Sequence, residues 1–109
     1  MSALLFLAQR ASAVVLALAV TVHLGTILYA VRGGLSAADI LARTHGNLGF
    51  LLFYGTFVVA VAIHAPIGLR SVVREWTAWR GRTLDIALTL FALLLFGLGM
   101  RAVFAVFTT

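Results

Sequence analysis

The chain has 109 residues, of which 63% are apolar and 10% charged, with a formal net charge of +5 and no cysteine. A soluble domain carries about 25% charged and about 45–50% apolar residues, so this composition excludes a water-soluble globule and predicts a protein embedded in a lipid membrane. The missing cysteines exclude disulfides, thiolate zinc sites and iron–sulfur ligation within this chain, and its singly scattered arginines do not form the basic patch that nucleic-acid binding requires.

Three apolar runs predict three transmembrane helices in one membrane domain, residues 1–109. The runs cover about residues 11–31, 46–69 and 84–107, each close to the roughly 20 residues that cross a bilayer. The first two contain no charged residue, and the third carries Asp85 and Arg101 near its ends, where charged side chains reach the interface. We therefore expect an all-α integral membrane protein.

The two connections between these spans differ in composition. Residues 32–43 begin with Gly33 and Gly34 beyond Arg32, and Ser36 fits a helix N-cap, so we expect a short turn leading into the second span. Residues 71–83 hold Trp76 and Trp79 near helical spacing, which predicts an interfacial helical segment with its tryptophans at the depth of the lipid headgroups. We expect Asp85 to be an interfacial residue beside this connection.

The arginines are distributed unequally between the two sides of the predicted membrane domain. One side, with the N-terminus and the second connection, holds Arg10, Arg70, Arg74, Arg80 and Arg82; the other holds Arg32, Arg43 and Arg101. Because positive charge accumulates in cytoplasmic loops, this count predicts a cytoplasmic N-terminus. We expect the chain to cross the bacterial cytoplasmic (inner) membrane several times.

Three histidines lie at membrane depth, and an ionisable side chain in lipid usually marks a functional site. A haem group, whose iron takes axial imidazoles from facing helices, would use such residues; the alternative is a neutral histidine bonded to a neighbouring helix. His45 and His64 start and end the second span, about 28 Å apart at the α-helical rise, so one haem cannot use both. His64 is the better candidate, because His45 lies at the interface, where a hydrated histidine costs little. His23 lies in the first span.

The residues around His64 leave room for a flat ring. Ala60 and Gly68 lie one turn before and after it on the same helical face, and Pro66 interrupts the backbone hydrogen bonding. The same small residues would also allow close helix packing without any cofactor. Arg10 and Arg70 lie at the same membrane level, where haem propionates would find cations; as flanking charges they would need no such role.

Residues 64–70, HAPIGLR, resemble the H-x-x-x-G-x-R signature of the cytochrome b membrane-anchor subunit of succinate dehydrogenase (succinate:quinone oxidoreductase, including fumarate reductases). Residues 9–13, QRASA, are similar to the H-R-x-S-G element that opens the first helix in that family. The resemblance extends from Arg10 to about Leu95. It departs from the family pattern at Gln9, where the family has His, at Ala13, where it has Gly, and at Phe6, where it has Ser.

The resemblance implies a site for each of several ligands. His64 would be an axial ligand of haem b, and His23 would be the ligand of a second haem, as in the two-haem members of the family. Arg10 and Ser12 would line a quinone pocket, and Arg10 and Arg70 would bind haem propionates. The chain would then be one part of a larger haem-binding helix bundle.

The resemblance also implies partners, because the chain has no complete active site of its own. A flavoprotein subunit would oxidise succinate, an iron–sulfur subunit would relay the electrons, and a second small membrane-anchor subunit would contribute the other axial ligand; a symmetric dimer using His64 twice is the other arrangement. Two alternative functions remain open from the sequence. One is an anchor for another quinone-linked dehydrogenase, and the other is a cofactor-free structural or assembly membrane protein.

Overall fold

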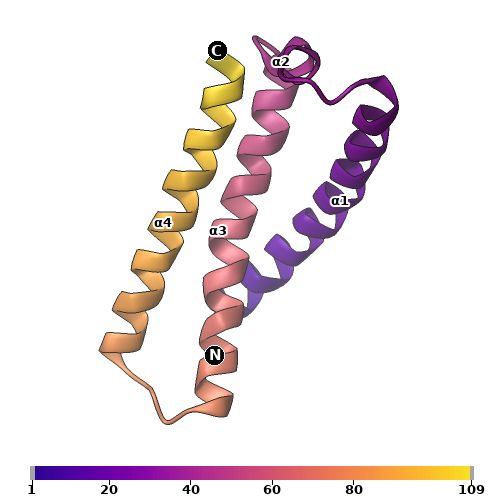
Figure 1. Cartoon of the computed structure of the whole chain (residues 1–109). Coiled ribbons are helices and arrows are strands. Elements are labelled where there is room, and N and C mark those ends of the chain that lie inside the picture. Colours follow the sequence, from indigo (N-terminus) through magenta and orange to yellow (C-terminus); the bar gives the residue numbers. More distant parts are fainter. Residues whose placement is uncertain (1, 109) are drawn as a thin grey trace.

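The structure, a computed structural model, describes residues 2–108 and contains four helices and no strand in that range (Figure 1). The helices are α1 (Ala3–Gly33), α2 (Ala37–Thr44), α3 (Leu48–Trp76) and α4 (Arg82–Thr108). Helices α1, α3 and α4 are long and apolar enough to cross a membrane, with mean hydropathies of 2.2, 2.0 and 2.3 in their most apolar windows. The all-α fold, with three helices long and apolar enough to cross a membrane, is therefore confirmed.

Helix α3 lies between the other two long helices. It packs against α1 and against α4, whereas α1 and α4 scarcely touch each other. Figure 1 shows α3 and α4 side by side along their whole length, while α1 leans away from α3 toward the end that carries α2. The α3–α4 connection lies at one end of the molecule, and α2 and the C-terminus lie at the other. The longest dimension is 49 Å, so the helix ends extend beyond a hydrocarbon layer of about 30 Å.

The outer faces of the long helices are covered by large apolar side chains. Leu4 in α1 is 76% exposed, Leu18 is 68% exposed, and Leu90 in α4 is 61% exposed. The buried core is small by comparison and includes Leu84, which is 1% exposed. A surface of this kind is stable against lipid rather than water, in agreement with the composition.

All three long helices are longer than their apolar runs, and α1 and α3 exceed them most. Helix α1 begins at Ala3, and the Ser2 side chain caps it by accepting a hydrogen bond from Leu5 N at 3.2 Å. Arg10 therefore lies inside α1 instead of preceding it. Helix α3 continues through Pro66 to Trp76, so residues 71–76 of the predicted helical segment are the last turns of α3, and the predicted helix is wrong for residues 77–81, which are not helical. Backbone hydrogen bonding continues beyond the apolar run, where hydropathy no longer indicates a helix.

The first connection contains a separate helix where we predicted a short turn. Ser36 is the N-cap, as predicted: its Oγ accepts from Asp39 N at 3.1 Å and donates to Asp39 Oδ2 at 2.7 Å. The hydrogen bond from Ser36 lowers the pKa of the Asp39 carboxyl below its ordinary value. Helix α2 ends at Thr44, however, and α3 starts afresh after its N-cap Asn47. Gly46, with φ of 65°, makes the break between them.

This break also anchors the end of α4. The Thr44 hydroxyl donates to the carbonyl oxygen of Val106 at 2.9 Å, and the Gly46 N–H donates to the carbonyl oxygen of Phe107 at 3.0 Å. The last carbonyls of a helix have no partner within the helix itself. The α2–α3 connection supplies those partners, and it thereby ties the C-terminal end of α4 to the start of α3.

Candidate functional site

Polar side chains join α1 to α3 at three levels. The Gln9 amide lies against Gly68, Ser12 lies beside His64, and His23 lies beside Tyr54. Residue numbers rise along α1 as they fall along α3, as expected for neighbouring antiparallel helices. We call these contacts the α1–α3 polar seam.

His64 faces α1 near the end of the molecule that carries the N-terminus. Its Nδ1 lies 3.5 Å from Ser12 Oγ, and the Ser12 hydroxyl donates to the carbonyl oxygen of Gln9 at 3.1 Å. Ser12 is 5% exposed, so this contact is inside the seam. The other ring nitrogen, Nε2, has no hydrogen-bond partner within residues 2–108 and is not among the fully buried unpartnered atoms of that range; we call such a nitrogen open.

Gln9 lies next to the Ser12–His64 contact, one turn before Ser12 on α1, and its side-chain amide lies against Gly68. Its Oε1 is the one buried side-chain oxygen or nitrogen without a hydrogen-bond partner within residues 2–108. A Cβ atom at position 68 would lie 3.3 Å from Gln9 Nε2, so the glycine makes room for the amide. Sequence reasoning treated Gln9 only as a departure from the family pattern. Its place one turn before Ser12 on the same face of α1 is the signal that could have found it.

Arg10 lies on a different face of α1 from Ser12. Residues two apart in a helix do not share a face, and Ser12 is buried against α3 while Arg10 is exposed. The Arg10 guanidinium lies over the ring of Phe6, 5.5 Å from its centroid. No ion pair of Arg10 is found within residues 2–108. Arg10 and Ser12 therefore do not point into one pocket of this chain, and Arg10 is available to an anion outside it.

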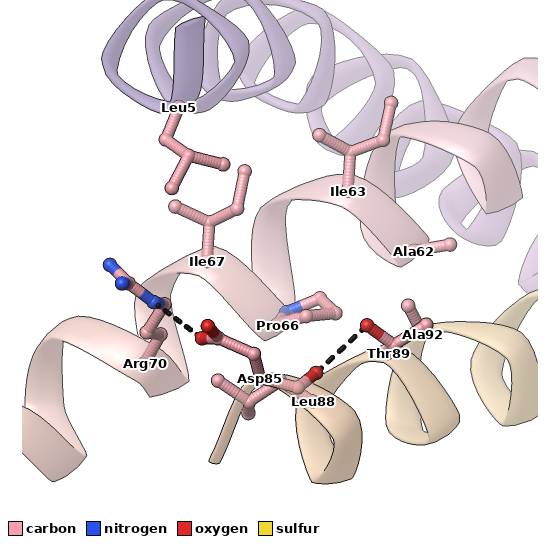
Figure 2. Close-up of a pocket in the computed structure, with 10 residues that line it drawn as sticks. All are labelled: Leu5, Ala62, Ile63, Pro66, Ile67, Arg70, Asp85, Leu88, Thr89 and Ala92. Carbon is pink, nitrogen blue, oxygen red and sulfur yellow. Dashed lines mark hydrogen bonds and ion pairs between the residues drawn. The ribbon is translucent and has the colours of Figure 1, made fainter. Parts of the chain in front are cut away.

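Arg70 is already paired with a carboxylate. Figure 2 shows it directed at Asp85, with Arg70 Nε 3.2 Å from Asp85 Oδ1, and both residues line a cavity of about 430 Å³ between α3 and α4. The side chains are 23% and 58% exposed, respectively. Pro66 and Leu88 line the same cavity, and Leu5 of α1 reaches it. We predicted Asp85 as an interfacial residue and missed this pairing, because residues 15 positions apart in the sequence meet only through the α3–α4 turn.

His23 is held at the other end of the seam. Its Nδ1 lies 2.8 Å from Tyr54 Oη, and Thr26 Oγ1 lies 3.1 Å from the same oxygen. The rings of Tyr54 and Phe57 both meet the His23 ring edge to face, with centroids 5.5 and 5.7 Å away. Tyr54 is a site residue that sequence reasoning missed. It was visible only as one of the few polar side chains in the second span.

A cleft lies where α1 leans away from α3, next to Tyr54. It has a volume of about 490 Å³ and is closed by α2, with Phe50, Phe53, Tyr29 and Arg43 among its lining residues. The Arg43 guanidinium lies over the Tyr29 ring, 5.5 Å from the centroid. His45 caps the end of α2 nearby and is exposed.

His64 and His23 do not belong to a cluster of potential metal ligands. No group of three or more His, Asp or Glu side chains lies together in the described chain, residues 2–108. The two contacts are about 15 Å apart along α3, so each histidine would belong to a different ligand. Comparisons with known protein families, with curated proteins and with solved structures find no match to this chain.

Proposed function

We propose that this chain is the cytochrome b membrane-anchor subunit of a succinate:quinone oxidoreductase, which carries electrons from an iron–sulfur subunit to membrane quinone. The observation that carries the proposal is His64: its open Nε2 lies in the HAPIGLR segment of a membrane-spanning helix, while its Nδ1 faces Ser12. A histidine turned entirely inward to its own chain could not serve as an axial ligand. Haem b would supply one-electron redox chemistry at this place.

Two arginines differ in what they offer to a bound haem. Arg70 would have to leave Asp85 before it could bind a propionate, whereas Arg10 has no carboxylate partner within residues 2–108. Arg10 is therefore the stronger candidate for the propionates, and Arg70 is held in place by Asp85. Because Arg10 lies on the exposed face of α1, it is also the candidate hydrogen-bond donor to a quinone. The neighbouring subunit would complete that quinone pocket.

Ser12 has a different role in this proposal from the one that the resemblance implies. Its side chain is buried against α3 and faces His64, so it supports the iron ligand and does not line the quinone pocket with Arg10. His23 would be the ligand of a second haem at the other end of the seam, with Tyr54 as its support. The second axial ligand of each haem would come from the partner anchor subunit.

A cofactor-free structural protein is the second candidate, and one observation favours it. Both His23 and His64 have a hydroxyl partner on the opposite helix, so the polar seam by itself accounts for two histidines in lipid. An anchor for another quinone-linked dehydrogenase would share every feature of the first proposal, because the substrate chemistry belongs to the soluble subunits.

The test is the visible spectrum of the chain purified from native membranes together with its bound subunits. The dithionite-reduced preparation should show the sharp α-band of a low-spin b-type haem, and His64→Ala should abolish that band or, if two haems are bound, reduce it by half. His45→Ala is the matched control, because His45 is exposed at the end of α2 and should leave the spectrum unchanged. A preparation without haem would favour the structural protein.

A further inference from the structure

The hydrogens at the Ser12–His64 contact can be assigned from the hydrogen-bond partners. A serine hydroxyl carries one hydrogen, and the Ser12 hydroxyl donates it to the carbonyl oxygen of Gln9 at 3.1 Å. With that hydrogen directed at Gln9, Ser12 Oγ keeps its lone pairs for His64 Nδ1, 3.5 Å away. In that arrangement the donor is the N–H of His64 Nδ1.

A neutral imidazole carries its hydrogen on one ring nitrogen and a lone pair on the other. We propose that Ser12 is a positioning residue that holds His64 in the tautomer with the hydrogen on Nδ1 and the lone pair on Nε2. Only that tautomer presents a lone pair at the open nitrogen. Its use for binding iron rests on the proposed function, but the tautomer itself does not.

The surroundings leave His64 Nδ1 no other partner. Ser12 is 5% exposed, and no further hydrogen bond to His64 Nδ1 is found within residues 2–108. The serine is also held in place, because its bond to Gln9 lies within the same helix. A buried acceptor of fixed position, facing a ring that has no competing partner, decides which nitrogen is protonated.

A similar arrangement is available at the other end of the seam. The Thr26 hydroxyl donates to the carbonyl oxygen of His23 at 2.7 Å, which leaves Thr26 Oγ1 free to accept from Tyr54 Oη, 3.1 Å away. A Tyr54 hydroxyl that donates to Thr26 accepts from His23 Nδ1 at 2.8 Å, whereas one that donates to His23 places the lone pair on Nδ1. The Ser12–His64 contact therefore carries the proposal alone.

This arrangement has a consequence for a bound metal. An imidazole that donates its second N–H to an acceptor is a more basic ligand with a defined ring orientation, and losing such a partner typically costs about 10–100-fold in metal affinity. In the haem-loaded protein, Ser12→Ala should weaken haem retention within that range and shift the midpoint potential upward, because a less basic ligand stabilises the ferric state less.

The direct test is nitrogen NMR of the full chain in lipid bilayers, labelled with ¹⁵N-histidine, at about pH 8, where histidine is in general neutral. The ¹⁵N shifts identify the protonated nitrogen, and the His64 signals are assigned by their loss in His64→Ala. The wild type should have the hydrogen on Nδ1, Ser12→Ala should move population to Nε2–H, and Ser12→Thr should retain the wild-type state. Thr21→Val is the matched control, since Thr21 is an exposed α1 hydroxyl that donates to Ala17 in its own helix.

Two NMR results would overturn the proposal: Nε2–H in the wild type, or no change in Ser12→Ala. If Ser12→Ala does not fold, the wild-type spectrum still decides the tautomer, and Ser12→Thr tests the hydroxyl. The measurements on bound haem, which are its presence, retention and midpoint potential, distinguish this proposal from the proposed function. A native preparation without haem would overturn the function and leave the tautomer standing, whereas bound haem with the same potential and retention in Ser12→Ala would overturn the positioning role.

Discussion

The two helix pairs of this molecule are built differently. The α3–α4 pair is tied at both ends: the Arg70–Asp85 ion pair joins one end, and the hydrogen bonds from Thr44 and Gly46 join the other. The α1–α3 pair leans apart toward α2 and is joined by the polar seam (Figure 1). Lipid provides no hydrophobic drive between helices, so packing and hydrogen bonds hold both pairs. The comparison indicates that α3–α4 is the stable scaffold and α1–α3 positions the polar side chains.

The largest expected effect of a single substitution is in the scaffold pair. A Cβ atom at Gly99 would lie 2.6 Å from Val58 Cγ1, so Gly99→Ala should force α3 and α4 apart and cost about 1–3 kcal/mol in the free energy of unfolding. Thermal or denaturant unfolding in detergent would measure the loss. Gly97→Ala is the control, because a Cβ at that position meets nothing within 4 Å. Equal stability of both variants would show that the two helices are less closely packed than the structure has them.

A smaller effect is expected in the polar seam. Tyr54→Phe removes the hydroxyl that His23 and Thr26 share and should cost about 0.6 kcal/mol, the usual value for a hydrogen bond between membrane helices. The same unfolding measurement applies, with Tyr29→Phe as the control, since no hydrogen bond of the Tyr29 hydroxyl is found within residues 2–108. A loss as large as that of Gly99→Ala would contradict the division into scaffold and positioning pair.

The smallest expected effect is at the ion pair. A double-mutant cycle with Arg70→Gln and Asp85→Asn should give a coupling of about 0.2–1 kcal/mol, because the Asp85 side chain is 58% exposed and its charge is screened. The coupling should fall as salt is added. A coupling that resists salt would place the pair in the low-dielectric part of the membrane and would strengthen the case that Asp85 holds Arg70 in position.

Part of the fold could be predicted because membrane crossing depends on length and apolarity alone. The three spans follow from the absence of charge over about 20 residues, and the Ser36 cap follows from a local motif. The extension of α3 to Trp76 could not be predicted in this way, because residues beyond the hydrocarbon can be polar and still helical. Helix α2 was missed because eight residues are too few to show a periodic pattern.

The candidate site was predictable in its residue types and not in its contacts. His64 and His23 were identified because each lies in an apolar span, where an ionisable side chain is costly to bury and usually marks a functional site. Neither Ser12 beside His64 nor Tyr54 beside His23 could be inferred, because each pair joins two helices. The pairing of Arg70 with Asp85 was missed for the same reason, and it changes which arginine is free to bind an anion.

The sequence by itself determined that this is a chain of three membrane-spanning helices with histidines inside two of them. Only the tertiary structure decided which side chains face each other. The physical reason is that contacts between helices depend on how each helix is rotated about its own axis. An amphipathic helix shows which face it buries, but each long helix here is apolar on nearly every side, so its sequence does not set its rotation about its own axis. Close packing at Gly99 and the hydroxyl partners of the two histidines set that rotation.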